Sequence, residues 1–177
     1  MDDEKYFRRN IVILYDDIYR FIYSLVKDPD VAQNLSQSTM EKAWTKLYQL
    51  RKRERAKSWL FQIAKNEVAL YFRDRQKDFF YDESLLNYRS KSCISAETDL
   101  SEILVYQEES RRLIYALDHL DLKYQELIKL WALGRLNLKE IAEILQINYN
   151  TARTHLRRGL EELRDIYFAV EKNEIKK

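Results

Sequence analysis

The chain has 177 residues and a formal net charge of only +2, and its most frequent residues, among them Leu, Lys, Glu and Arg, favour helices. Two glycines and one proline are too few for a sheet-rich fold or a glycine-rich phosphate loop. A single cysteine excludes an intrachain disulfide, and one cysteine with two histidines argues against a metal or cofactor site. No apolar run approaches the roughly 20 residues that cross a bilayer, and residues 1–10 lack a signal peptide's apolar segment, so we expect a cytoplasmic protein without direct membrane insertion.

Three helical patterns occupy the first part of the chain. Apolar residues at three- and four-residue steps predict one helix from about residue 4 to residue 26, ending where Pro29 disfavours helical geometry in the residue before it. A second helix is expected from about residue 30 to 48, and a third begins near Ser58. Core packing is the expected role of nearly all the apolar side chains on these helices.

Between the second and third helices lies a basic run, in which five of the seven residues 51–57 are Lys or Arg. Such a run is usually only a solvated surface. Here aromatic and amide side chains lie close to it in the sequence: Tyr48, Trp59, Phe61, Gln62 and Asn66. Cations that hold phosphates, beside flat side chains and amides that meet unstacked bases, favour contact with a single DNA strand.

The middle of the chain differs from both ends in charge. Residues 1–77 carry a net charge of +5, residues 78–104 carry −4, and residues 105–177 carry +1. Residues 78–100 show no sustained helical period, so we interpret them as having low helical content, with Cys93 as an incidental exposed thiol. The sequence therefore predicts an all-α protein with two small helical domains, residues 1–77 and 105–177, joined by a flexible acidic linker at 78–104.

The second domain shows helix-terminating and helix-starting signals in close succession. Asp121 can cap one helix, and Gly134 is placed to end it. Asn137 with Glu140 three residues later predicts a capping box at the start of a short helix. After a turn at residues 146–148, Asn148 can cap a longer helix, and the two helices with their turn predict a helix-turn-helix motif.

The longer helix separates its apolar side chains from its polar ones. A narrow seam would hold it on the domain through Ala152, Leu156, Leu160 and Leu163. The outward set suits a DNA major groove, where guanidinium pairs with guanine and small polar groups meet base edges or phosphate: Asn150, Arg153, Thr154, Arg157 and Arg158. The alternative is an ordinary surface helix in which Arg157 and Arg158 pair with the acids four residues later.

The order of these motifs resembles the extracytoplasmic-function group of bacterial RNA polymerase sigma factors, the smallest members of the sigma-70 family. Residues 14–44 resemble region 2.1–2.2 of that family, residues 58–75 resemble regions 2.3–2.4, and residues 120–163 resemble region 4. The resemblance covers nearly the whole chain. It is carried by the order of the motifs and by the short acidic linker that stands in place of a region 3 domain.

The resemblance implies a non-catalytic specificity subunit that binds core RNA polymerase and promoter DNA and has no small-molecule substrate. It assigns polymerase contact to four positions: Leu35, Gln37, Met40 and Trp44. It assigns capture of a flipped base of the minus-ten element to the basic run and the next helix: Arg51, Lys52, Arg53, Arg55, Lys57, Ser58, Gln62, Lys65 and Asn66. The helix-turn-helix would read the minus-thirty-five element. Many relatives are held inactive by an anti-sigma factor, which makes such a protein a candidate partner.

Some positions depart from the family pattern. Acidic residues common on the polymerase-facing surface are replaced by Gln33, Asn34 and Ser38, which would weaken polymerase binding. The glycine usual in the helix-turn-helix turn is Gln146, which would be strained if the turn needs a positive φ. Two other functions stay open: an autonomous helix-turn-helix regulator, which would need to dimerise to read two half-sites, and a sigma-like adaptor that binds only protein.

Overall fold

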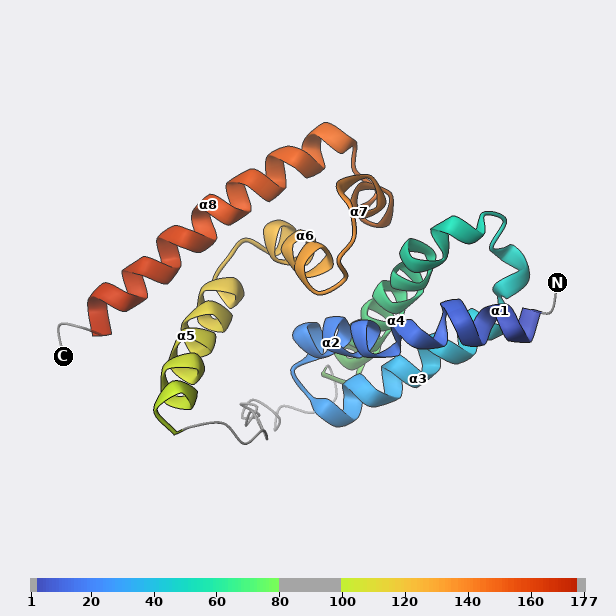
Figure 1. Cartoon of the computed structure of the whole chain (residues 1–177), viewed down its shortest axis with the longest axis horizontal. Helices are drawn as coiled ribbons and strands as arrows, with labels where there is room; N and C mark the ends of the chain where they lie inside the picture. Colours follow the sequence, from blue (N-terminus) through green and yellow to red (C-terminus); the bar gives the residue numbers. More distant parts are fainter. Residues whose placement is uncertain (1–2, 80–99, 175–177) are drawn as a thin grey trace.

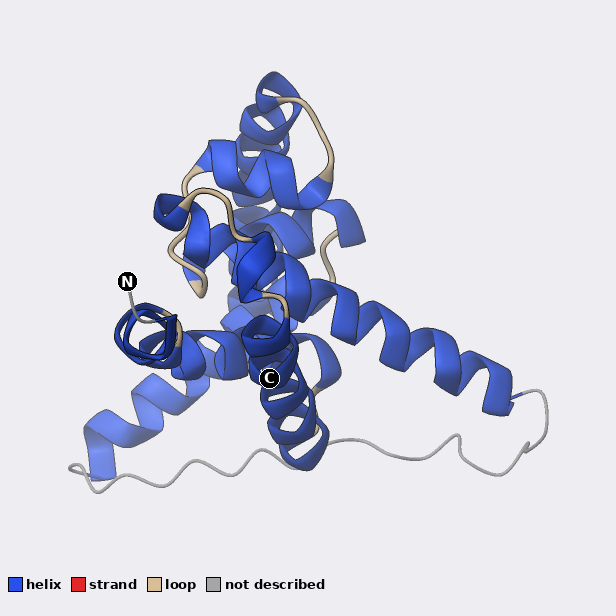
Figure 2. Cartoon of the chain, turned by 90° about the vertical axis from the view of Figure 1, so that its right-hand side faces the viewer, coloured by secondary structure: helices blue, strands red, loops and turns tan. Residues whose placement is uncertain are grey.

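The computed structural model describes residues 3–79 and 100–174, with side chains described for residues 3–75 and 109–170. Over these ranges the chain forms helices and contains no strand, as predicted from the sequence (Figure 2). The elements are α1 Asp3–Asn10, the 3-10 turn η1 Val12–Leu14, α2 Tyr15–Val26, α3 Pro29–Thr45, the 3-10 turns η2 Leu47–Gln49 and η3 Arg53–Arg55, α4 Ala56–Phe79, α5 Leu100–Asp118, α6 Leu122–Ala132, α7 Leu138–Leu145 and α8 Tyr149–Glu174.

The helices form two groups that follow the order of the chain. Helices α1 to α4 make one bundle, and α5 and α6 pack on the long helix α8 in the other, with α6 and α7 on the side that faces the first bundle (Figure 1). Most of the predicted linker, including Cys93, lies outside the described residues. Helix α4 ends at Phe79 and α5 begins at Leu100, so both helices extend into the range 78–104 that the sequence pattern assigned to the linker.

The single helix predicted from about residue 4 to 26 is wrong in one respect, because it is interrupted. Helix α1 ends at Asn10, and the 3-10 turn η1 separates it from α2. Ile11, Val12 and Ile13 are three β-branched residues in a row, which lose side-chain freedom in an α-helix and weaken it there. Ile11 is fully buried and anchors the break, whereas Ile13 is 69% exposed.

The predicted helix caps are confirmed. Asp121 accepts a hydrogen bond from the backbone of Lys123 at the start of α6. Asn137 and Glu140 form the reciprocal capping box of α7, and the Asn148 side chain accepts from the backbone of Thr151 at the start of α8. These contacts satisfy backbone donors that a helix start leaves unpaired, so the sequence fixes where the helices of the helix-turn-helix begin.

Gln146 occupies the turn between α7 and α8 with a φ of 55°. This is the left-handed conformation that glycine adopts without a steric cost, so Gln146 is strained at the position where the resemblance leads one to expect a glycine. The turn forms nonetheless, because the Gln146 and Ile147 amides donate to carbonyls of the last turn of α7.

Each bundle has a buried apolar centre. In the first, the rings of Phe21 and Phe61 lie 5.3 Å apart between α2 and α4. In the second, α8 approaches α6 closely at Gly159, where an added Cβ would lie 2.9 Å from the Cβ of Tyr124. Phe61 of the first bundle and Leu127, Ile141 and Ile144 of α6 and α7 belong to one continuous buried cluster, so α6 and α7 cover part of the first bundle.

An ion pair joins α3 to α4 inside the first bundle. Glu67 is only 6% exposed, and its carboxylate accepts from Lys42 Nζ at 2.6 Å and from Ser38 Oγ at 2.7 Å. The Ser38 hydroxyl therefore contacts α4 within the chain. No helix within the described ranges combines the length and apolarity that crossing a bilayer requires.

Candidate nucleic-acid interface

The basic run folds as a tight connection between α3 and α4. The connection consists of the turn η2, residues 50–52 outside any helix, the turn η3 and the first turn of α4, which already contains Lys57 and Ser58. Ala56 is buried and fixes the start of α4, and Ser58 Oγ donates to the Arg55 carbonyl at 3.1 Å. The backbone of Arg51 and its neighbours is thus held by local contacts while the long cationic side chains extend outward.

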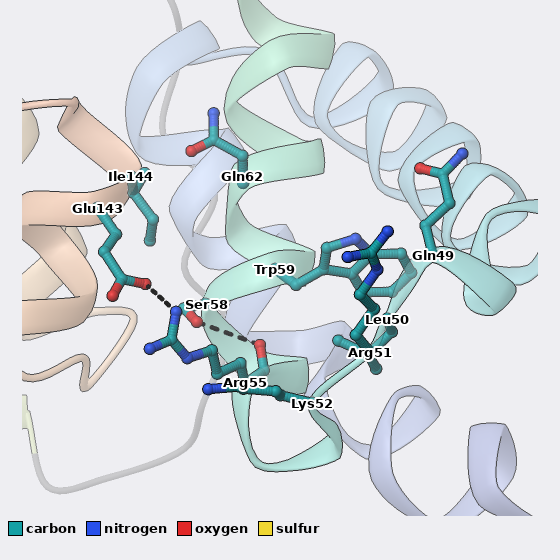
Figure 3. Close-up of a pocket in the computed structure, with 10 residues that line it drawn as sticks. All are labelled: Gln49, Leu50, Arg51, Lys52, Arg55, Ser58, Trp59, Gln62, Glu143 and Ile144. Carbon is teal, nitrogen blue, oxygen red and sulfur yellow. Dashed lines mark hydrogen bonds and ion pairs between the residues drawn. The ribbon is translucent and has the colours of Figure 1, made fainter.

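A pocket of about 400 Å³ lies beside this connection (Figure 3). One side is formed by the connection and α4, with Arg51, Trp59 and Gln62 among its lining residues. The other side comes from α7, through Glu143 and Ile144. The pocket combines a flat aromatic side chain, an amide and several cations, the groups that stack on a base, hydrogen-bond its edge and hold its phosphates.

Most cations of the predicted minus-ten set already have acidic partners within the chain. Arg53 pairs with Asp3 at 3.0 Å, and Lys57 lies 3.9 Å from Asp17. The guanidinium of Arg53 also sits over the ring of Tyr6, 4.2 Å from its centroid. Burial raises the pKa of the Tyr6 hydroxyl above its usual value, although the nearby Arg53 charge opposes that shift.

Two further cations of this set pair with α6 and α7. Arg55 Nη1 lies 3.2 Å from Glu143 Oε2, and Lys65 Nζ lies 3.2 Å from Glu126 Oε1. Arg51 and Lys52 have no ion pair with any described residue, and both are exposed. The structure brings part of the predicted minus-ten set together around the pocket, namely Arg51, Lys52, Arg55, Ser58 and Gln62. Only part of the charge of the set is available to a ligand in this arrangement.

The second predicted surface lies along the first half of α8 and is open to solvent. All five residues of the predicted outward set are exposed: Asn150, Arg153, Thr154, Arg157 and Arg158. Arg157 Nη1 pairs with Glu161 at 2.7 Å, which is the pair that the surface-helix alternative expects. Arg158 has no ion pair with Glu162 in the structure.

The apolar seam predicted for α8 is only partly correct. Ala152 is fully buried, and Leu156 and Leu163 are half-buried, but Leu160 is 37% exposed. The close contact of α8 with α6 is instead made at Gly159, one position earlier. Periodicity overlooked this glycine because it scores as a weak helix residue rather than as a packing position.

The four predicted polymerase-contacting residues lie along α3. Gln37 and Trp44 are exposed, while Leu35 and Met40 are half-buried against the core. Trp44 is 47% exposed, and its ring meets the Phe7 ring of α1 edge to face at 5.1 Å. The helix therefore presents a partly apolar surface that continues onto α1.

Comparison with known proteins matches both halves of the chain to families. Residues 12–78 match the family Sigma-70 region 2, and residues 110–163 match Sigma-70, region 4. The chain is 32% identical over 150 residues to the RNA polymerase sigma factor SigV of Bacillus subtilis, covering 84% of this chain and 82% of that protein. It is 27% identical over 156 residues to the ECF RNA polymerase sigma factor SigM of the same organism, covering 86% and 89%.

Solved structures share the arrangement of helices. The sigma factor RpoE from Bartonella quintana, in complex with the anti-sigma factor NepR, superimposes with a TM-score of 0.71 at 22% identity, covering 90% of this chain and 95% of that chain. CnrH, solved in complex with the cytosolic domain of CnrY, gives a TM-score of 0.65 at 17% identity, covering 94% and 90%. At these identities the similarity establishes the fold.

Proposed function

The chain belongs to the extracytoplasmic-function group of RNA polymerase sigma factors, and we propose that its two basic surfaces divide promoter recognition between them. A sigma factor is a non-catalytic subunit that binds core RNA polymerase and promoter DNA. This membership favours the sigma function over the autonomous regulator and the protein-binding adaptor. We propose residues 1–77 as the region 2 unit and residues 105–177 as the region 4 unit.

The duplex minus-thirty-five element is assigned to α8. Support comes from the exposure of Asn150, Arg153, Thr154, Arg157 and Arg158 on one face of a helix that follows a capped turn. Their donors match guanine and phosphate acceptors in a major groove. The buried contacts at Ala152 and Gly159 keep the opposite face on the domain, so the outward set is presented on a fixed scaffold.

We assign the melted minus-ten element to the pocket beside the basic run. The set of side chains that line this pocket is the observation that carries the proposal. Trp59 and Gln62 offer stacking and hydrogen bonding, and Arg51 and Lys52 offer unpaired charge at its rim. The predicted minus-ten set also includes Ser58, Asn66 and the cations of the run. Ser58 is 5% exposed and bonded to the Arg55 carbonyl, so we propose that it shapes the pocket and leaves base contact to its neighbours.

We place the polymerase contact on α3, with Gln37 and Trp44 as its exposed members and Leu35 and Met40 beneath them. Because transcription takes place in the bacterial cytoplasm, that is the proposed location of the protein. An anti-sigma factor is a candidate partner. The related fold of RpoE from Bartonella quintana was solved with the anti-sigma factor NepR bound, which supports this proposal.

A run-off transcription assay with core polymerase tests the assignment. The promoter is first selected from a random library by the reconstituted holoenzyme. Replacing Arg51, Lys52, Arg53 and Arg55 with alanine is expected to spare closed-complex binding and to impair strand opening, measured by permanganate reactivity of unpaired thymines. If the quadruple variant opens the promoter as well as the wild type, the basic run is only a solvated surface.

A further inference from the structure

We propose that region 4 masks the minus-ten pocket when the chain is free of polymerase, with the Glu143 carboxylate of α7 bound in the place of a DNA phosphate. The inference rests on the proposed function of the basic run. It adds an intramolecular competitor for that site and names the contacts that must break before a DNA strand can enter.

The first observation is the position of Glu143 in the pocket. Its carboxylate reaches across from α7 and lies 3.2 Å from the Arg55 guanidinium, on the side of the pocket opposite the α4 wall (Figure 3). Arginine binds carboxylate and phosphate oxygens by the same charge-assisted hydrogen bonds. A strand phosphate approaching Arg55 would therefore have to displace Glu143.

A second cation is engaged in the same way. Lys65 Nζ lies 3.2 Å from the Glu126 carboxylate of α6 and 3.4 Å from the Ile144 carbonyl in the last turn of α7. The last turn of a helix exposes carbonyl oxygens with partial negative charge, which attract cations. Region 4 thus binds Lys65, a proposed DNA contact, through the Glu126 carboxylate and the C-terminal turn of α7.

Apolar contact holds the two regions together. The bend after α6 lies against Phe61 of α4, since a Cβ added at Gly134 would stand 3.0 Å from the Phe61 ring. Ile144 is 2% exposed and belongs to the same buried cluster as Phe61. The ion pair of Arg55 with Glu143 is half-exposed, and pairs of that kind contribute little to stability. Apolar burial therefore stabilises the contact between regions 2 and 4. The two acids, Glu143 and Glu126, occupy Arg55 and Lys65 and compete with DNA for them.

Polar contacts at the edge of this interface fix its register. Lys129 of α6 is 3% exposed, and its Nζ donates to the Ser24 carbonyl of α2 at 3.1 Å. Lys27 pairs with Asp118 at 3.2 Å across the same boundary. A buried ammonium needs such partners, so Lys129 favours the position of α6 in which it reaches the end of α2.

The spacing of a promoter is incompatible with this arrangement. The minus-ten and minus-thirty-five elements are about 25 base pairs apart, or about 85 Å along B-form DNA. In the structure, the first helix of the helix-turn-helix itself forms a wall of the minus-ten pocket. The two surfaces cannot occupy both elements until region 4 moves away from region 2. Polymerase binding is the event that would hold them apart.

Energy transfer in the full-length chain tests the masking directly. Cys93→Ser provides a background in which fluorophores are attached at Lys5→Cys on α1 and Lys139→Cys on α7, both exposed positions. Glu126→Lys with Glu143→Lys places like charges opposite Lys65 and Arg55. Glu109→Lys with Asp165→Lys makes the same change in net charge at exposed positions of region 4 and serves as the control. Circular dichroism confirms that each variant keeps its helices.

The free wild-type chain should show high transfer that falls when core polymerase is added. The interface variant should show low transfer without polymerase and should bind a fluorescent single-stranded oligothymidine about 5- to 150-fold more tightly than the control variant, the range of typical coupling between two sites. Transfer and DNA affinity equal to those of the control would overturn the proposal, as would lower transfer without tighter DNA binding. The permanganate assay distinguishes failure of the masking proposal from failure of the proposed function of the pocket. It measures how the basic run affects strand opening in the holoenzyme, where masking plays no part.

Discussion

The basic run and the first half of α8 both carry exposed arginines, but their surroundings differ. On the run and the helix after it, Arg53, Arg55, Lys57 and Lys65 are each within ion-pair distance of an acid from another element. Among Arg153, Arg157 and Arg158 of α8, only Arg157 is paired, and its partner Glu161 lies one turn away on the same helix. A cationic sequence therefore predicts affinity for nucleic acid. Acids that the fold brings close to the cations compete with nucleic acid for them.

The difference suits two kinds of target. Duplex DNA is present before transcription begins, so a surface that reads it can stay open. A melted strand exists only after polymerase has acted, and a cationic pocket that bound any single strand in the free protein would be unspecific. The predictions below change one surface at a time and are ordered by the size of the effect.

The largest effect is expected at Arg153, which is exposed on α8 and has no ion pair among the described residues. If it contacts a base, Arg153→Ala should cost about 1–3 kcal/mol of promoter binding and relax the preference at one position. Promoter titrations at two salt concentrations measure this. Arg157→Ala is the comparison variant, because Arg157 is paired with Glu161 and must leave it before it can contact DNA. If both variants lose no more than a few tenths of a kcal/mol of promoter-binding free energy and keep their specificity, α8 is only a surface helix.

Next in size is the loss of the two unpaired cations of the basic run. Arg51→Ala with Lys52→Ala should lower strand opening in the holoenzyme by at least about tenfold, since each charged hydrogen bond to a phosphate contributes on the order of 1 kcal/mol or more. Binding to the duplex minus-thirty-five element should not change. Arg20→Ala with Arg164→Ala removes the same charge at exposed positions elsewhere, and equal permanganate signals from the two double variants would contradict the assignment.

A smaller effect is expected from pH on the contact between the regions. Burial lowers the pKa of Lys129 to about 8 in the closed arrangement; the charge of Lys27 acts in the same direction, and Asp118 and Glu126 oppose it. In an open chain the ordinary value is 10.5. Below pH 8 the Lys129 amine is protonated in both states, so closure does not change with pH. Above pH 8 closure releases a proton and should be favoured by at most about tenfold per pH unit.

Energy transfer measured from pH 7 to 9 checks this direction: transfer should rise with pH in the wild type. In Lys129→Met, which has no titrating group at that position, the dependence should disappear. A wild-type response that runs in the opposite direction, or a variant that keeps the response, would show that other groups control closure.

The smallest effect concerns the turn that supports α8. Gln146 has a φ of 55°, so Gln146→Gly should relieve strain and stabilise region 4 by about 0.5–1 kcal/mol, reduced by the greater freedom of glycine in the unfolded chain. Thermal unfolding measures the gain, and Gln49→Gly in the turn η2 provides a comparison at a residue without a positive φ. Lower stability of the Gln146 variant would mean that its side chain contributes contacts that outweigh the strain.

The features predicted correctly from the sequence are those encoded locally. The capping box of Asn137 and Glu140 needs only residues three apart, and the exposed arginines of α8 follow from helical periodicity. The interrupted first helix shows the limit of this approach, because an apolar stripe continues through a 3-10 turn without marking the break. The β-branched run from Ile11 to Ile13 was the available signal.

Contacts between distant residues could not be predicted. The sequence shows that Ser38 replaces an acid, but it does not show that the Ser38 hydroxyl donates to Glu67, which lies 29 residues further along the chain. Glu143 carries no local mark of its contact with Arg55, 88 residues away. Its significance depends on the packing of α7 against α4, which no local sequence pattern encodes.

The most direct test compares both surfaces before and after polymerase binding. Fluorescence anisotropy measures the affinity of the free chain, and then of the holoenzyme, for two labelled DNAs: a duplex with the selected minus-thirty-five element and the single non-template strand of the minus-ten element. Core polymerase alone and the holoenzyme of the Arg51, Lys52, Arg53 and Arg55 quadruple alanine variant are the controls. We expect polymerase to raise the affinity for the single strand far more than that for the duplex. If the free chain already binds the single strand as tightly as the holoenzyme does, the pocket is open from the start and the contrast between the two surfaces is wrong.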